Sequence, residues 1–133
     1  MSHPIRILSG EPNFDRLPVL KLHCGTEVPI NDRIFAQAQL GLCDSCFYAR
    51  LWTFEVEPSL DSSMSLLLEG PTGSLRLRVS YGGSAALQIR ERDHSELLSA
   101  YRILGEDLQG AYWGAVAMIP LDDFCAALGI APP

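Results

Sequence analysis

Apolar and polar residues alternate along a series of short segments from residue 35 onward. Alternation with a period of two places the apolar side chains on one face of a β-strand and the polar side chains on the other. Turn residues, mostly glycine and proline, separate these segments. The pattern predicts β-strands over residues 35–42, 47–56, 64–69, 74–80, 85–90, 101–104 and 112–119.

The two ends of the chain have different patterns. Prolines interrupt residues 1–33 and favour extended backbone before them, which predicts an extended segment packed on the domain, with a short edge strand at 19–22. Residues 112–119 are apolar on both faces, as expected for a central strand covered on both sides. Residues 121–128 are amphipathic and Gly129 follows them, which predicts a short C-terminal helix.

Many short strands joined by turns predict an all-β fold, specifically an antiparallel β-sandwich of the jelly-roll or immunoglobulin-like kind, with the short C-terminal helix added. A parallel βαβ fold is disfavoured because helical segments between the strands are missing. The 133 residues fit one domain, 1–133, since two cores would leave each half too small to be stable.

Strand register can be predicted because paired residues share a face of the sheet. In the first hairpin Leu68 is expected opposite Leu75, around a four-residue loop of glycine, proline, threonine and glycine. In the second hairpin Leu77 is expected opposite Ile89, which leaves 82–84 as a three-residue loop with glycine at a positive φ angle.

This register brings polar residues together on the opposite face. Arg78 is expected opposite Gln88, and Arg76 opposite Arg90. Two arginines directly opposite each other destabilise a strand pair unless another group compensates. The ordinary interpretation is a solvated face with acidic counter-ions. The alternative is a binding face for a sugar or an acidic partner, because the arginine fork holds oxygens in bidentate fashion.

Aromatic residues are the other candidates for ligand contact, since flat rings stack on the apolar faces of sugars. Trp52 and Trp113 are expected in the core, whereas Tyr81 beside a glycine turn and Tyr101 after a polar loop are expected to be exposed. The candidate ligand-binding residues are Arg76, Arg78, Gln88, Arg90, Tyr81, Tyr101 and Trp52.

Cys43 and Cys46 form a CxxC motif whose two flanks are both predicted strands. Asp44 and Ser45 are then the tip of a hairpin, and the two thiols face each other closely enough to form a disulfide under oxidation. A structural thiol pair is favoured. A metal site would need further ligands, for which only His23 and Cys24 are at hand, and a redox role would need a βαβ context; both alternatives stay open.

The charge balance limits the partners. Ten Lys and Arg residues against sixteen Asp and Glu give a net charge of -6, so neither nucleic acid nor an anionic membrane is an expected partner. The sequence has no apolar stretch near the ~20 residues that cross a bilayer. No basic start with an apolar run is visible, so a cytoplasmic location is expected.

Catalytic motifs are not evident, and the protein is not expected to be an enzyme. The three histidines are scattered, and His94 lies in a polar loop. Glu55 and Glu57 alternate on one strand face, which is weak evidence for an acid pair. Asp122 and Asp123 fit a helix N-terminus, where carboxylates complement the dipole.

Three stretches, 47–58, 61–68 and 112–121, together resemble the family 9 carbohydrate-binding modules and their bacterial relatives. The resemblance covers roughly residues 35–129 and consists of strand patterns and a few anchor residues. It implies a jelly-roll-like sandwich and non-catalytic sugar binding. The residues themselves point to no cofactor; calcium, which some members of the family bind, is implied by the resemblance alone.

Two hypotheses follow for the function. The first is a carbohydrate-binding-like module that holds a sugar or similar oxygen-rich ligand on a sheet face. The second is a structural or interaction protein that has kept the sandwich, has lost sugar binding and acts through self-association as a homodimer.

Overall fold

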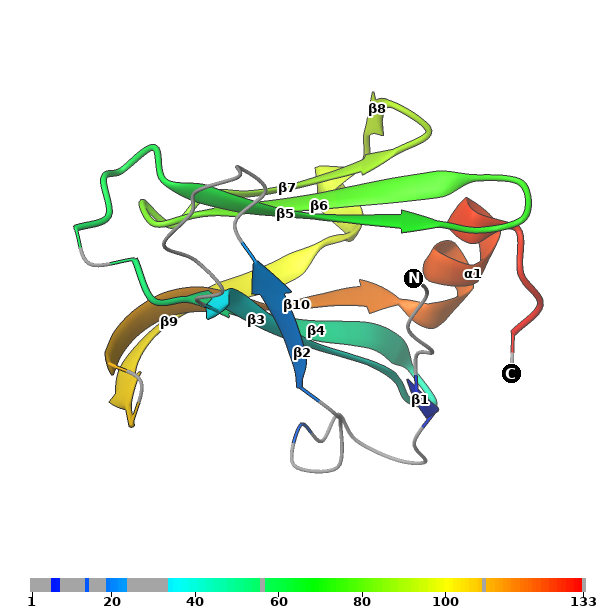
Figure 1. Cartoon of the computed structure of the whole chain (residues 1–133). Coiled ribbons are helices and arrows are strands. Elements are labelled where there is room, and N and C mark those ends of the chain that lie inside the picture. Colours follow the sequence, from blue (N-terminus) through cyan, green and yellow to red (C-terminus); the bar gives the residue numbers. More distant parts are fainter. Residues whose placement is uncertain are drawn as a thin grey trace.

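Two β-sheets lie one above the other in the computed structural model, which describes residues 6–7, 14, 19–23, 34–55, 57–108 and 110–132 (Figure 1). The larger sheet, called sheet A, contains β1 (Arg6–Ile7), β2 (Leu20–His23), β3 (Ile34–Leu42), β4 (Cys46–Thr53), β9 (Ser99–Asp107) and β10 (Gly110–Pro120). The smaller, called sheet B, contains β5 (Ser63–Glu69), β6 (Ser74–Ser80), β7 (Ala85–Ile89) and β8 (Arg92–Asp93).

Antiparallel pairing dominates both sheets. Sheet A has the order β1-β3-β4-β10-β9, with β2 also paired to β3, and sheet B has the order β5-β6-β7-β8. The pair β1–β3 is parallel, and the other pairs are antiparallel. The predicted mostly antiparallel β fold with one short helix is therefore confirmed.

The core lies between the two sheets because each strand turns its apolar face inward. On β6 the buried residues Leu75, Leu77 and Val79 alternate with exposed arginines. Leu77 and Val79 pack against Leu51 and Trp113 of sheet A. The apolar residues that alternate along β6 therefore lie on the side of sheet B that faces sheet A, as the sequence pattern predicts.

The C-terminal helix α1 (Leu121–Leu128) covers one end of the core (Figure 1). Phe124 of α1 stacks on Phe47 of β4, with ring centroids 4.3 Å apart. The helix ends at Gly129, whose φ of 72° is left-handed, as expected for a glycine that follows a helix. Among the described residues, no helix is long and apolar enough to cross a membrane.

The hairpin registers are partly as predicted. Leu68 does lie opposite Leu75. The expected pairing of Leu77 with Ile89 is wrong, because Leu77 lies opposite Leu87. The two registers differ by two residues and leave the same side chains facing inward, so the hydrophobic pattern does not distinguish them.

The strand limits also differ from prediction at several points. β9 is longer than the predicted 101–104, β8 is an additional short strand, and β4 ends at Thr53 instead of 56. The predicted edge strand near residue 20 is confirmed as β2, which pairs with β3. Most of the predicted extended segment 1–33 lies outside the described residues; Phe14, which is described, packs edge-on against Tyr48.

Candidate functional site

The face of sheet B that is turned away from sheet A carries the polar residues picked out in the sequence. Arg76 and Arg78 on β6 and Gln88 on β7 are exposed there. Gln88 lies directly opposite Arg76, and Leu67 of β5 lies opposite Arg76 on its other side. Paired residues share a face, so this surface, called the outer face of sheet B, brings three candidate residues together.

Two hollows lie on the outer face of sheet B. One has a volume of about 240 Å³, and Arg76, Gln88 and Glu69 are among its lining residues. The other has a volume of about 460 Å³, and Arg78 and Asp61 are among its lining residues. Both hollows therefore combine cationic donors with carboxylate acceptors, a set that suits hydrogen bonding to a hydroxyl-bearing ligand.

The arginines of this face have no acidic partner within the described part of the chain. The salt bridge found there joins His94 Nδ1 to Glu96 Oε1, 3.4 Å apart, and involves neither Arg76 nor Arg78. The guanidinium groups of both arginines are therefore available to a ligand. Acidic side chains do line the same hollows, Glu69 with Arg76 and Asp61 with Arg78, so the solvated face with nearby acidic residues stays an open interpretation.

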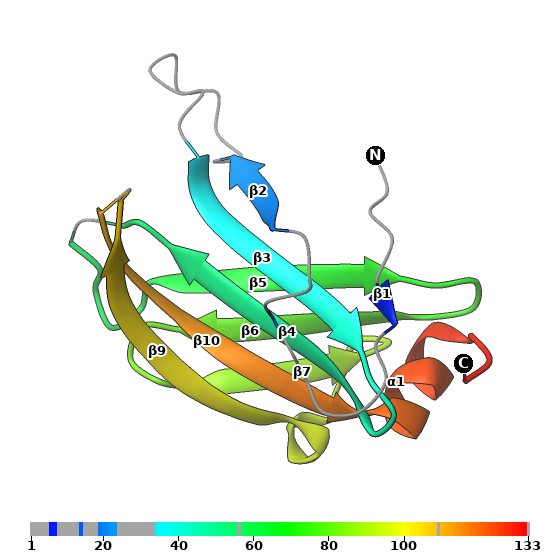
Figure 2. The same cartoon turned by 90° about the horizontal axis from the view of Figure 1, so that it is seen from below.

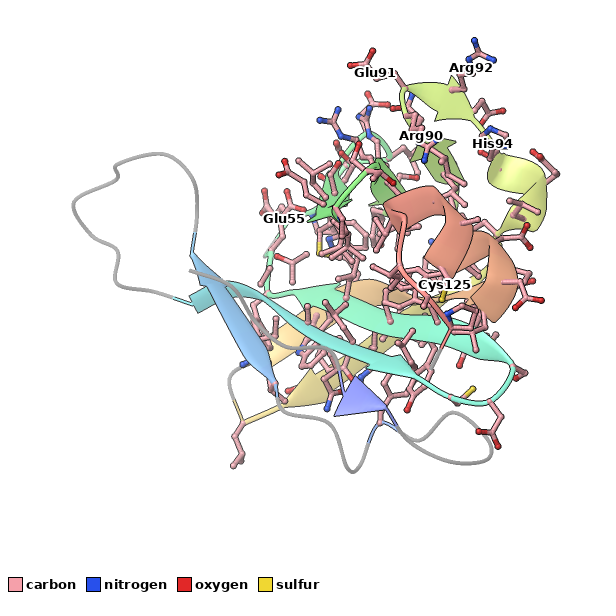
Figure 3. All side chains as sticks on the ribbon, turned by 90° about the vertical axis from the view of Figure 1, so that its right-hand side faces the viewer. Glu55, Arg90, Glu91, Arg92, His94 and Cys125 are labelled. Atoms are coloured by element: carbon pink, nitrogen blue, oxygen red, sulfur yellow. The ribbon has the colours of Figure 1, made fainter. Side chains whose placement is uncertain are left out.

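Arg90 does not lie opposite Arg76, but it lines the hollow of about 240 Å³ together with Arg76 and Gln88. It lies in the turn between β7 and β8, with a φ of 52°, and the next residue, Glu91, has a φ of 69°. The Arg90 side chain lies close to Gly73, because a Cβ added to this glycine would stand 2.9 Å from Arg90 Nε. The Arg90 guanidinium thus points toward the hairpin end and α1, whereas Glu91 and Arg92 point outward (Figure 3). The predicted oppositions of Arg76 with Arg90 and of Arg78 with Gln88 are both wrong, because Arg76 lies opposite Gln88 and Arg78 lies opposite Ala86.

The aromatic candidates do not join the arginines. Tyr81 is half-buried and packs edge-on against Trp113, with centroids 5.8 Å apart. Tyr101 is exposed, as expected, but it lies on β9 of sheet A. Trp52 is 7% exposed, and it lies on the side of β4 opposite Leu51, so it is buried on the outer side of sheet A and not between the sheets.

A second polar cluster, which the sequence did not reveal as such, surrounds Trp52. The Arg50 guanidinium lies 4.9 Å from the Trp52 ring centroid and 5.1 Å from that of Phe14. It donates a hydrogen bond to Gln39 Oε1, while its buried Nε has no hydrogen-bond partner among the described residues. Arg50, Trp52 and Tyr112 line a small hollow of about 100 Å³. The sequence feature that could have indicated this cluster is the spacing of Arg50 and Trp52, which are two residues apart and so share a strand face.

The CxxC hairpin has the predicted geometry. The Cys43 N–H donates to the Cys46 carbonyl at 2.9 Å, and the two Sγ atoms are 3.5 Å apart. Burial acts to raise the pKa of Cys43, but hydrogen bonds with Ser45 and Cys46 outweigh it, so this pKa lies below the usual thiol value. Burial, and to a lesser extent the charge of Asp122, raises the pKa of Cys125. Cys24 lies outside the described residues.

Glu55 has a structural position. Its Oε1 accepts a hydrogen bond from Trp113 Nε1 at 3.2 Å, and its Oε2 accepts one from Ser62 Oγ at 3.0 Å. Figure 3 shows Glu55 well separated from His94. Glu57 is exposed. The acid pair and histidine considered above therefore do not converge.

The described residues contain no group of three His, Cys, Asp or Glu side chains that could hold a metal ion. No protein-family model, no curated protein and no solved structure matches this chain. The similarity to family 9 carbohydrate-binding modules therefore stays a prediction.

Proposed function

We propose that this protein is a non-catalytic binding module that holds an oxygen-rich ligand, a sugar or a similar compound, on the outer face of sheet B. The observation that carries the proposal is the exposure of Arg76, Arg78 and Gln88 side by side on two paired strands, with no salt bridge to either arginine from the described residues. Exposed donors without an acidic partner are available for a ligand that supplies acceptors.

The arginines favour a sugar that carries an acidic group for them to bind, while Glu69 and Asp61 of the same hollows can accept hydrogen bonds from its hydroxyl groups. Guanidinium groups bind carboxylates through two parallel hydrogen bonds, and a glutamine amide offers both donors and an acceptor to hydroxyl groups. Strands β5, β6 and β7 carry no aromatic residue, so a ring of a neutral sugar finds no stacking platform on them. Leu67, which is 50% exposed beside Arg76, offers a small apolar contact instead.

A jelly-roll or immunoglobulin-like sandwich is part of the same proposal. Its support is the pair of facing sheets and the path of the chain, which leaves sheet A after β4, forms all of sheet B and returns to sheet A at β9. Calcium is left out of the proposal, because only the family resemblance implied it.

Titration calorimetry with neutral and acidic oligosaccharides tests the proposal. Arg76→Glu and Arg78→Glu are expected to weaken binding of an acidic sugar by about 10- to 100-fold each, the range expected for losing a charged hydrogen bond. Arg92→Glu makes the same charge change on β8, at a residue that lines neither hollow, and is expected to leave affinity within about twofold.

Two outcomes contradict the proposal. One is silence of the unmodified protein across a broad panel of acidic and neutral glycans. The other is binding that Arg76→Glu and Arg92→Glu weaken equally, since that result indicates an effect of overall charge and not a site on this face.

A further inference from the structure

Strand β9 forms one edge of sheet A. The strand order of sheet A ends in β9, and among the strands that the structure describes β10 is its neighbour. Figure 2 shows β9 along the margin of the sheet, with no described strand beyond it. It is nine residues long, Ser99–Asp107. A long open edge exposes backbone donors and acceptors that can pair with another chain.

One hydrogen bond identifies the β9 residues whose backbone groups point to this open edge. The Cys43 N–H bonds to the Cys46 carbonyl, which makes Cys43 and Cys46 a hydrogen-bonded pair of β3 and β4. Hydrogen-bonded and non-hydrogen-bonded pairs alternate along antiparallel strands, and a residue that bonds to one neighbouring strand turns away from the other.

This alternation can be carried across sheet A, because the registers of β3–β4, β4–β10 and β10–β9 are regular throughout. It assigns the odd-numbered residues of β9 to hydrogen bonds with β10. The N–H and C=O groups of Ala100, Arg102, Leu104 and Glu106 therefore point to the open edge.

The side chains of these residues are self-complementary. Arg102 and Glu106 are exposed, and Leu104, midway between them, is 59% exposed. The three lie on one face of the strand, since they are two residues apart. When a second copy of β9 is aligned antiparallel around Leu104, its Glu106 carboxylate lies opposite Arg102. Its Arg102 guanidinium lies opposite Glu106.

We infer that the protein forms a symmetric dimer in which β9 pairs antiparallel with β9 of a second copy. Leu104 lies opposite Leu104 of the partner subunit, and Arg102 lies opposite Glu106 of the partner subunit. Each ion pair occurs twice, because the same surface is used by both copies. The backbone groups that face the open edge then complete one continuous sheet across the two subunits.

Other antiparallel registers fit less well. A register centred on Arg102 places two guanidinium groups directly opposite each other, and one centred on Glu106 does the same with two carboxylates; like charges in that position are destabilising. Registers centred between these residues place charged side chains opposite Leu104. Only the alignment around Leu104 pairs both charges with opposite charges.

Arg102 also has a contact within its own chain that orients it. Its Nη1 donates to the Tyr81 carbonyl at 2.8 Å, and its guanidinium lies 5.5 Å from the Tyr81 ring centroid. A guanidinium has five N–H donors, so this contact leaves donors for a carboxylate of the partner subunit. Tyr81 thus positions the arginine at the edge.

Light scattering or sedimentation over a dilution series, at one ionic strength, tests the inference with the full chain. The unmodified protein is expected to shift from the mass of one chain to that of two as concentration rises. Glu106→Arg and Arg102→Glu each create two like-charge pairs and are expected to weaken association roughly tenfold or more. The double variant, R102E with E106R, restores both ion pairs and is expected to recover dimer formation.

Controls separate this edge from other surfaces. Glu106→Arg is the cleaner single variant, because Arg102→Glu also removes the contact with Tyr81; far-UV circular dichroism checks that both remain folded. Arg92→Glu, on β8, is expected to leave the dimer unchanged, and so is Arg76→Glu on the proposed ligand face. Sugar binding and dimer formation can therefore fail independently.

The inference is overturned by a protein that stays monomeric at all concentrations, by a dimer that neither single reversal weakens, or by a double variant that associates no better than the single ones. Loss of the dimer in Arg76→Glu with retention in Glu106→Arg also overturns it, since the interface then lies on the outer face of sheet B.

Discussion

The Glu55 carboxylate is expected to be a structural anchor for the buried indole of Trp113. Trp113 is 2% exposed, and its Nε1–H donates to Glu55 Oε1 at 3.2 Å. Glu55→Ala removes this acceptor and leaves a buried donor unpaired, which costs about 1–3 kcal/mol. The bond from Ser62 Oγ to Glu55 Oε2 joins two half-buried residues and adds about 0.5–1 kcal/mol.

Urea denaturation followed by far-UV circular dichroism measures the expected loss, about 1.5–4 kcal/mol in the free energy of unfolding. Glu57→Ala is the matched control, because Glu57 is exposed, and it is expected to change stability by less than about 0.5 kcal/mol. Glu55→Gln keeps an oxygen acceptor for Trp113 and is expected to lose less than Glu55→Ala.

A double-mutant cycle with Trp113→Phe isolates the hydrogen bond. Trp113→Phe removes the donor, so Glu55→Ala costs less in that background, and the coupling energy is expected to be about 1–2 kcal/mol. Equal stability of the Glu55→Ala and Glu57→Ala variants, or full additivity with Trp113→Phe, would refute the anchoring role of Glu55.

Two further predictions concern backbone conformation and thiol chemistry. Gly129→Ala is expected to lower the free energy of unfolding by about 1–2 kcal/mol or more, because φ is 72° and a Cβ would stand 1.8 Å from Thr72 Oγ1. Calorimetric melting measures this loss, and an unchanged melting temperature would contradict it. A small disulfide reagent is expected to join Cys43 and Cys46, whose Sγ atoms are 3.5 Å apart, with the reagent reduced to two thiols. Buried Cys125, whose pKa is raised, is expected to stay a thiol at neutral pH, where little thiolate forms. Peptide mass mapping that finds Cys125 modified as fast as Cys46 would contradict this.

The separation of the candidate residues into two surfaces changes the functional picture. The arginines and the glutamine lie on the outer face of sheet B, whereas Trp52 and Tyr101 belong to sheet A. The predicted set therefore does not bring the arginines and the aromatic rings together on one surface. The Arg50 and Trp52 cluster on the outer side of sheet A has that composition, but Arg50 is already engaged by Gln39 and two aromatic rings.

Local patterns in the sequence were sufficient for several features. The alternation in β6 predicts which residues are buried because a strand turns successive side chains to opposite faces. The cysteine hairpin follows from two apolar strands with Asp44 and Ser45 between them. The C-terminal helix and its glycine end are also short-range features. Each depends on residues only a few positions apart.

The β6–β7 register shows where local patterns stop being informative. Leu77 finds an apolar partner in either Ile89 or Leu87, and only the tight loop with Gly83 at a φ of 97° selects Leu87. As a consequence, Arg90 moves from the strand into a left-handed turn. A pattern of period two cannot detect a shift of two residues.

The amino-acid sequence by itself determined most of the longer β-strands, the inward side of β5, β6 and β7, and the exposed Arg76, Arg78 and Gln88, because these depend on alternation within a segment. Only the tertiary structure decided which strands share a sheet, that Trp52 is buried away from the main core, that Glu55 holds Trp113, and that β9 forms an edge with a self-complementary charge pattern. Those features depend on contacts between segments far apart in the chain, and many alternative pairings satisfy the same local pattern.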